Sequence, residues 1–191
     1  MKLLTIFISA LLIDNIILMR LVALYPFIGM DADEEKAKNL GKAVIFVSVL
    51  ATLVTWPVYK FVLEPLGLVF LEIMVFVLII AALVHLLGAL LDKPLPTPKN
   101  SIGGNFVLIA TNSAVLFVTF DAIRSGYNFI ESIVYAFGVS LGFLLTVMLF
   151  SGIRRRIRIS PIPSFLKGAP ILFMTACLLS MAFMGFSGLV K

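Results

Sequence analysis

Long runs of apolar residues, separated by short polar segments, dominate this chain of 191 residues. Each run is close to the ~20 residues that an α-helix needs to cross ~30 Å of hydrocarbon. The runs are continuous rather than alternating, which disfavours the strands of a transmembrane barrel. They cover approximately Leu3–Leu24, Ala43–Phe61, Leu66–Leu91, Ile102–Phe120, Phe129–Ile153 and Ala169–Val190. The pattern predicts an all-α integral membrane protein with six transmembrane helices.

The composition supports a membrane location. Hydrophobic residues make up 61% of the chain and charged residues only 13%, too little polar surface to cover a water-soluble globule. The first apolar run continues through Asp14 without a small-residue cleavage site, so we interpret it as a membrane helix and not as a secretory signal. The short loops leave no room for a soluble catalytic domain or a nucleotide-binding fold, and we expect no independent enzyme.

A proline-rich segment divides the chain near its middle. It runs from Leu91 to Asn100 and contains Pro94, Pro96 and Pro98, and proline cannot continue a helix without losing a hydrogen bond. We therefore expect residues 1–191 to form one membrane domain of two three-helix halves, 1–92 and 101–191. Three helices per half require opposite membrane orientations if the halves are repeats. The motifs around Asn15 and Asn112 can be aligned on their asparagines, which favours an inverted repeat.

The positive charges predict how the chain is oriented, because cytoplasmic loops are enriched in lysine and arginine. The excess lies after the first, third and fifth helices, at Lys36, Lys38, Lys42, Lys93, Lys99, Arg154, Arg155, Arg156, Arg158 and Lys167. These loops are expected on the cytoplasmic side of the membrane, with both termini outside. The run Arg154–Arg158 is juxtamembrane, which favours contact with anionic lipids of the bilayer over binding of nucleic acid.

Three polar residues in the apolar runs are candidates for an ion or proton path: Asp14, Asn15 and Asn112. A charge in mid-helix costs ~2.5–3.5 kcal/mol and usually faces protein or water. Asp14 can therefore belong to such a path, or it can be protonated or hydrogen-bonded to a neighbouring helix. Tyr25-Pro26 predicts a helix break near the membrane surface. Asn112 and Ser113 offer side chains that satisfy freed backbone groups if the fourth helix is also interrupted.

Other polar and small residues carry structural interpretations. Glu72 is expected to snorkel to the headgroups, and His85 and Cys177 are expected to be packed, since one histidine and one cysteine do not build a metal site. No metal ligands are assigned. The glycine pairs Gly138/Gly142 and Gly185/Gly188 predict close helix packing, within the chain rather than with a second chain.

Several of these motifs together carry a family resemblance that spans essentially the whole chain. They are Asp14-Asn15, Arg20, Leu24-Tyr25-Pro26-Phe27-Ile28-Gly29, Thr111-Asn112-Ser113-Ala114-Val115-Leu116 and Ala182-Phe183-Met184-Gly185-Phe186-Ser187-Gly188-Leu189. The sequence resembles the A-type membrane proteins of Rnf electron-transport complexes and, less closely, the paired membrane subunits of the sodium-pumping NADH:quinone reductase.

The resemblance implies a multi-pass membrane subunit of an ion-translocating ferredoxin:NAD⁺ oxidoreductase in a prokaryotic cytoplasmic (inner) membrane, with electron transfer coupled to Na⁺ or H⁺ transport. Its implied partners are a homologous E-type subunit of opposite orientation and the flavin and iron–sulfur subunits of the complex. In this family the two paired subunits hold an iron–sulfur cluster, each through two cysteines.

The chain departs from the family at the cluster positions. Tyr25 and Ser113 stand where the family carries cysteines, and iron–sulfur clusters are held by thiolates. Either the cluster is absent, its ligands come from elsewhere, or the two positions were altered from a cysteine-bearing parent. We expect no cofactor bound by this chain alone. The alternative function is a redox-silent membrane transporter or assembly scaffold with the same fold.

Overall fold

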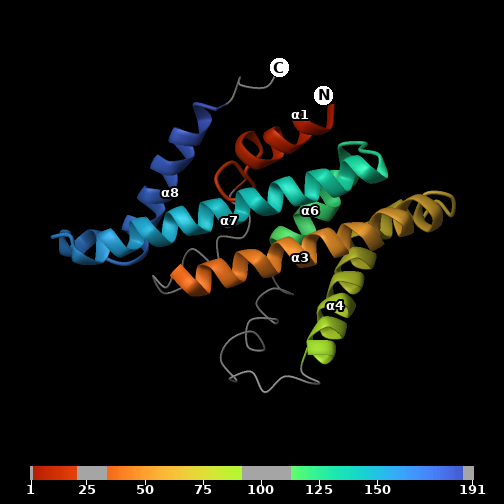
Figure 1. Ribbon diagram of the computed structural model, residues 1–191, viewed down its shortest axis with the longest axis horizontal. Helices are drawn as coiled ribbons and strands as arrows, with labels where there is room; N and C mark the ends of the chain where they lie inside the picture. The colour runs from red at the N-terminus through yellow and green to blue at the C-terminus, as the bar shows by residue number, and fades with distance from the viewer. Residues whose placement is uncertain (1, 21–33, 92–112, 187–191) are drawn as a thin grey trace. The chain divides into compact units, whose positions relative to one another are not determined.

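The computed structural model of the chain describes residues 2–20, 34–91 and 113–186 (Figure 1). Within these ranges every regular element is helical. The α-helices are α1 (Lys2–Ile8), α3 (Glu34–Val58), α4 (Glu72–Leu91), α6 (Ser113–Arg124), α7 (Phe129–Ile159) and α8 (Ala169–Met184). The π-helical segments are η1 (Ser9–Ile13) and η2 (Tyr59–Leu63), and the 3₁₀ segments are η3 (Val69–Leu71) and η5 (Ser164–Leu166).

The helices agree with the predicted membrane class. In the described ranges, three helical segments are long and apolar enough to cross a bilayer: Ala37–Leu63, Val69–Gly88 and Phe129–Ile159. Two shorter apolar helices cover Lys2–Ile13 and Ala169–Met184. With α6, each of the six predicted apolar stretches contains a helix. The all-α fold class is confirmed. The inverted repeat stays a prediction.

Two helices are longer than the apolar runs that predicted them. The helix α3 begins at Glu34 rather than Ala43, and α7 ends at Ile159 rather than Ile153. Lysine, glutamate and arginine are good helix formers once the chain has left the hydrocarbon. The charges also suit the helix dipole, because Glu34 and Glu35 lie in the first turn of α3 and Arg156 and Arg158 lie in the last turn of α7.

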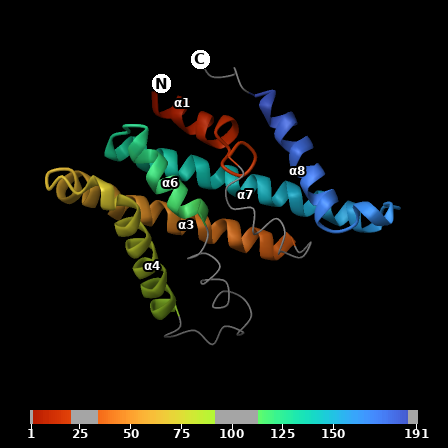
Figure 2. The same cartoon turned by 180° about the vertical axis from the view of Figure 1, so that it is seen from behind.

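The described chain forms two compact units. The first combines Met1–Lys42 with Gly138–Lys191, and the second is Ala43–Phe137. In the first unit, α1 and α8 lie on the same side of α7 (Figure 2). The start of α3 approaches α7 at Gly41, where an added Cβ would lie 2.2 Å from Leu144 Cδ1. The predicted halves 1–92 and 101–191 stay a prediction, because residues 92–112 lie outside the described residues.

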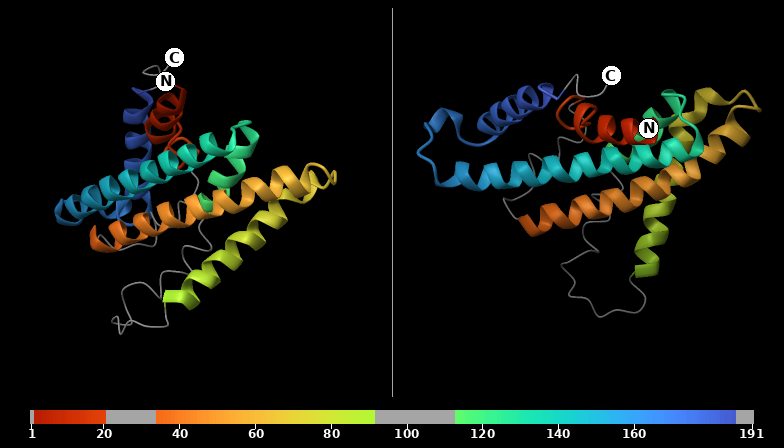
Figure 3. Two further views of the ribbon diagram at one scale, coloured as in Figure 1. Left: turned by 45° about the vertical axis from the view of Figure 1, so that its right-hand side comes forward. Right: turned by 45° about the horizontal axis from the view of Figure 1, so that its top comes forward.

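The second unit is organised around two tight turns at one of its ends, one joining α3 to α4 and the other joining α6 to α7 (Figure 3). Gly67 and Gly126 hold these turns with φ of 68° and 69°, in the left-handed region that favours glycine. The indole Nε1 of Trp56 in α3 donates a hydrogen bond of 3.0 Å to the Tyr127 carbonyl. The ring of Trp56 also packs against Phe129, with centroids 5.3 Å apart. An aromatic contact therefore joins the end of α3 to the start of α7.

The start of α7 is fixed by a glutamate that folds back on the backbone. The Glu131 Oε2 accepts a hydrogen bond of 3.1 Å from the Asn128 N–H, as the third residue of a capping box does. The first regular bond of the helix follows, with Ser132 N–H donating to the Asn128 carbonyl at 2.8 Å. Glu131 therefore gives an acceptor to a backbone donor at the helix entry, where such donors lack intrahelical partners.

We expect Glu131→Ala to lower the free energy of unfolding by about 1 kcal/mol, because the Asn128 N–H loses its acceptor. The measurement is the thermal midpoint of the purified protein in detergent. Glu64→Ala is the control: Glu64 makes an exposed pair with Lys60 at 2.6 Å, and its removal is expected to cost under about 0.5 kcal/mol. Equal midpoints for the two variants would contradict this role of Glu131.

Candidate functional site at a broken first helix

The first helix ends in the middle of the first apolar run. The π-helical turn closes with Asp14 N–H donating to the Ser9 carbonyl at 2.8 Å, and a new turn opens with Met19 N–H donating to the Asn15 carbonyl at 2.8 Å. The prediction of a continuous helix through Leu24, with Asp14 in its interior, is therefore wrong. The predicted break at Tyr25-Pro26 lies outside the described residues.

Asn15 explains the break. Its side-chain Oδ1 accepts hydrogen bonds from the N–H groups of Ile17 at 3.2 Å and Leu18 at 3.4 Å, as an N-cap residue does. Its Nδ2 donates to the Gly142 carbonyl at 3.0 Å and to Thr146 Oγ1 at 2.7 Å, both in α7. The amide is fully buried. One side chain therefore begins the new turn and fastens it to α7.

The irregular backbone of the break is enclosed by protein. Asn15, Ile16, Ile17 and Leu18 are all at most 3% exposed. Non-helical backbone at membrane depth is tolerated only where its polar groups find partners away from lipid. Counted from Lys2, Asp14 lies roughly 18 Å along the helix axis, near the middle of a ~30 Å hydrocarbon layer. The break is thus a buried polar point within the first apolar run.

The last described helix supplies one more partner. Ser180 Oγ in α8 donates to the Leu18 carbonyl at 2.9 Å. This carbonyl lies in the irregular segment that follows Asn15, so α8 also fastens the break.

We expect Ser180→Ala to lower the free energy of unfolding of the purified protein by about 1 kcal/mol, because the Leu18 carbonyl loses the hydroxyl that donates to it. Thr175→Ala is the matched control: the Thr175 hydroxyl bonds to the Ile171 carbonyl of its own helix at 2.7 Å, which keeps its backbone bond, so a smaller loss is expected. A loss for Thr175→Ala as large as for Ser180→Ala would contradict the assignment.

The glycines of α7 allow the first helix to approach closely. A Cβ on Gly142 would lie 2.6 Å from the Leu11 carbonyl oxygen and 3.3 Å from Asn15 Nδ2. A Cβ on Gly138 would lie 3.0 Å from both the Phe7 carbonyl oxygen and Ala10 Cβ. The close packing predicted for Gly138 and Gly142, here called the glycine seam, is confirmed as a contact within the chain. Of the second predicted pair, Gly188 lies outside the described residues. The seam and Thr146 share one face of α7 because their spacing is four residues.

Asp14 gives the break its carboxylate. The side chain is half-buried, and Ser9 Oγ donates to its Oδ2 at 3.0 Å. Carboxylate oxygens accept several hydrogen bonds or bind hard cations, so Asp14 offers an acceptor to a hydrogen-bond donor or a ligand to a cation. We name Ser9, Asp14, Asn15, Gly142 and Thr146 the break site. It contains two of the three predicted path residues, and Asn112 lies outside the described residues. Thr146 and Ser180 were missed from the sequence because only the fold brings them to the break.

Comparison with known proteins shows the family of the chain. A family model described as Rnf-Nqr subunit, membrane protein, matches residues 3–190. The chain belongs to the Rnf-Nqr family. It is 43% identical over 189 residues to the A subunit of the ion-translocating oxidoreductase complex of Syntrophotalea carbinolica, covering 99% of this chain and 98% of that protein.

Two further relatives in the Rnf-Nqr family are similar over nearly their whole length. The A subunit of the Na⁺-translocating ferredoxin:NAD⁺ oxidoreductase complex of Acetobacterium woodii is 43% identical over 189 residues, 99% of this chain and 98% of that protein. The A subunit of the ion-translocating oxidoreductase complex of Vibrio cholerae is 41% identical over 184 residues, 96% of this chain and 95% of that protein. The predicted resemblance is confirmed.

One of the two residues that the family resemblance matches to cluster cysteines lies in the described part of the chain. Ser113 is the first residue of α6 and is exposed, and an aliphatic hydroxyl is a poor substitute for a cluster thiolate. Tyr25 lies outside the described residues. In the described part of the chain, no three side chains of histidine, cysteine, aspartate or glutamate gather as metal ligands.

Three expectations for single polar residues are wrong. Glu72 does not snorkel: it is 8% exposed and pairs with Arg124 at 3.5 Å, and the Arg124 guanidinium also lies 4.2 Å from the ring centroid of Phe120. The ion pair with Arg124 of α6 stabilises the buried Glu72 carboxylate within the second unit. His85 and Cys177 are exposed on the surface of this chain rather than packed inside it.

Proposed function

We propose that this chain is the A-type membrane subunit of an ion-translocating ferredoxin:NAD⁺ oxidoreductase complex of the Rnf type. There it supports transmembrane electron transfer coupled to Na⁺ or H⁺ transport. The observation that carries this conclusion is the 43% identity, over 99% of the chain, to the A-type member of such a complex in Acetobacterium woodii. The chain acts as one subunit of the complex and not as an enzyme by itself.

The chain works in the cytoplasmic membrane with a homologous E-type subunit, and with the flavin and iron–sulfur subunits of the complex. The basic end of α7, from Arg154 to Arg158, faces the cytoplasm, and both termini face outside. Affinity purification through a tag on this chain, in mild detergent, tests the assembly. The flavin subunits and the E-type subunit are expected in the eluate. Purification of the chain without any redox subunit would contradict the proposal.

The break site and Asn112 belong to the path of the coupling ion. Asp14 and Asn15 support this, because they place a carboxylate and an amide at a helix break near the midplane, where discontinuous helices of transporters bind ions. We expect Asp14→Asn to lower ion uptake per NADH formed in inverted membrane vesicles, with Glu64→Gln as the exposed control. An unchanged uptake ratio in the Asp14→Asn vesicles would count against the path.

Tyr25 and Ser113 do not supply ligands to the family cluster, because neither residue is a thiolate. Iron content and low-temperature electron paramagnetic resonance of the anaerobically purified complex test this statement. The comparison is the unaltered complex against the variant Tyr25→Cys/Ser113→Cys. A cluster signal at this interface that appears only in the variant would show a preserved site that has lost its ligands, and would favour the redox-silent alternative. The same signal in the unaltered complex would mean that other residues hold the cluster and that the electron relay is intact.

The alternative is a redox-silent transporter or assembly scaffold built on the same fold. The presence of Tyr25 and Ser113 in place of cysteine is the observation in its favour. Cysteines at the corresponding positions of the neighbouring E-type chain support the redox function, and their loss there supports the alternative.

A further inference from the structure

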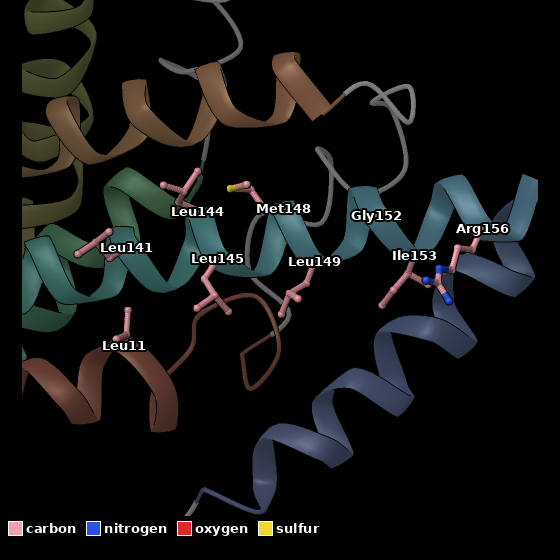
Figure 4. Close-up of a pocket in the computed structure, with 9 residues that line it drawn as sticks. All are labelled: Leu11, Leu141, Leu144, Leu145, Met148, Leu149, Gly152, Ile153 and Arg156. Atoms are coloured by element: carbon pink, nitrogen blue, oxygen red, sulfur yellow. The ribbon is translucent and has the colours of Figure 1, made fainter.

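An apolar groove runs along α7 on the surface of the first unit (Figure 4). Its volume is about 810 Å³. Figure 4 shows Leu145, Leu149 and Ile153 pointing to one side of α7, with Leu11 of η1 at one end of the groove and Arg156 at the other. The spacing of three to four residues puts these α7 side chains on one helix face. The hollow is therefore an open apolar groove that ends at a cation.

The groove has the length of one leaflet of a bilayer. From Leu141 to Ile153, α7 rises roughly 18 Å, against ~15 Å for half of the hydrocarbon layer. Arg156 lies about one further turn along the helix, at the depth of the lipid headgroups. The basic run places this end of α7 on the cytoplasmic side. The apolar walls thus match the acyl region of the cytoplasmic leaflet, and the cation matches its phosphate layer.

Arg156 is the basic residue suited to a ligand of this groove. It is exposed and, among the described residues, it forms no ion pair. Arg154 and Arg158 line a different hollow beside the start of α8, together with Gly168 and Leu172. The guanidinium of arginine binds phosphate through two parallel hydrogen bonds. Charge complementarity therefore selects an anionic headgroup over a second apolar helix.

We propose that this groove is a binding site for an anionic phospholipid of the cytoplasmic leaflet. One acyl chain lies along Leu145, Leu149 and Ile153, and the headgroup phosphate binds Arg156. This site is separate from the break site and goes beyond the redox function of the complex. A lipid held in this way remains bound to the chain when the annular lipids exchange.

Gly152 offers a way to fill the groove without disturbing the fold. It lines the groove, and a Cβ built on it meets nothing within 4 Å. Gly152→Phe is expected to occupy the space of the acyl chain. Gly88→Phe is the matched control, because Gly88 in α4 also has nothing within 4 Å of its added Cβ and does not line the groove. Arg156→Gln removes the phosphate contact, with the exposed Arg155→Gln as its control.

The test is native mass spectrometry of the intact complex purified in mild detergent, with added dioleoyl phosphatidylglycerol as the probe. Gly152→Phe is expected to weaken lipid binding about tenfold, the effect of losing roughly two buried methylene groups. Arg156→Gln is expected to weaken phosphatidylglycerol binding about fivefold. It is expected to weaken dioleoyl phosphatidylcholine binding less, because the choline ammonium offsets the charge of the phosphate that Arg156 binds. Inorganic phosphate alone is expected not to compete, because it cannot occupy the apolar walls.

Two outcomes would overturn the proposal. The first is equal retention of phosphatidylglycerol by each variant and its control, which assigns the bound lipid to other surfaces. The second is unchanged lipid binding in Gly152→Phe together with loss of a neighbouring protein from the purified complex, which assigns the groove to a protein partner. Arg156→Gln changes only an exposed side chain, so it decides the question even if Gly152→Phe fails to assemble.

Discussion

Gly142→Ala is expected to lower the free energy of unfolding by about 3 kcal/mol and to reduce the yield of assembled complex. The added Cβ would lie 2.6 Å from the Leu11 carbonyl oxygen, a backbone atom that cannot rotate away. The helices must separate, which also stretches the bonds from Asn15 to the Gly142 carbonyl and Thr146. Overpacking of this kind costs ~1–3 kcal/mol, and the strained hydrogen bonds raise the cost. Thermal unfolding of the purified complex measures it.

The same substitution ten residues along α7 is a matched control. Gly152→Ala adds its Cβ where nothing lies within 4 Å, and alanine in a helix interior is favoured over glycine by ~0.5–1 kcal/mol. Gly152→Ala is therefore expected to be neutral or slightly stabilising. Equal thermal midpoints for the two variants would show that the chain accommodates a Cβ at Gly142 without cost, and would contradict the close contact with Leu11.

Asn15→Ala is expected to be the most damaging single change at the break site, lowering stability by roughly 4 kcal/mol. It removes the acceptor for the N–H groups of Ile17 and Leu18 and the donor to Gly142 and Thr146. Buried groups left without partners cost ~1–3 kcal/mol each when water cannot replace them. The loss of the N-cap adds about 1 kcal/mol.

Two milder variants separate the roles of Asn15. Asn15→Ser keeps a hydroxyl that can cap the new turn but cannot reach α7, so about half of the loss is expected. Thr146→Val removes only one partner and is expected to cost about 1–2 kcal/mol. Thermal unfolding and complex yield are measured for all three. A loss below about 1 kcal/mol for Asn15→Ala would contradict its role as the residue that holds the break.

Much of the architecture could be predicted from the sequence because lipid imposes a simple rule. A helix must be apolar for about 20 residues to span the bilayer, so runs such as Phe129–Ile153 mark where helices lie. The glycine pair Gly138/Gly142 also predicted a contact correctly, since the absence of side chains at that spacing allows close approach.

The helix break could not be located from the sequence in the same way. The run Leu3–Leu24 is apolar enough to be one helix, and an asparagine within it has no fixed role. What fixes Asn15 is the Gly142 carbonyl and the Thr146 hydroxyl, which lie 127 and 131 residues away in the chain. Glu72 was misjudged for a similar reason, because its partner Arg124 comes from another helix. Long-range partners, unlike hydropathy, cannot be read from a local pattern.

This chain is a membrane subunit of an ion-translocating oxidoreductase complex. The most direct test measures NAD⁺ reduction by reduced ferredoxin, together with Na⁺ and H⁺ uptake, in inverted membrane vesicles with and without the chain. Both activities are expected to disappear when the gene for this chain is deleted and to return together when it is restored. Undiminished ferredoxin-dependent NAD⁺ reduction and ion uptake in vesicles that lack the chain would contradict it.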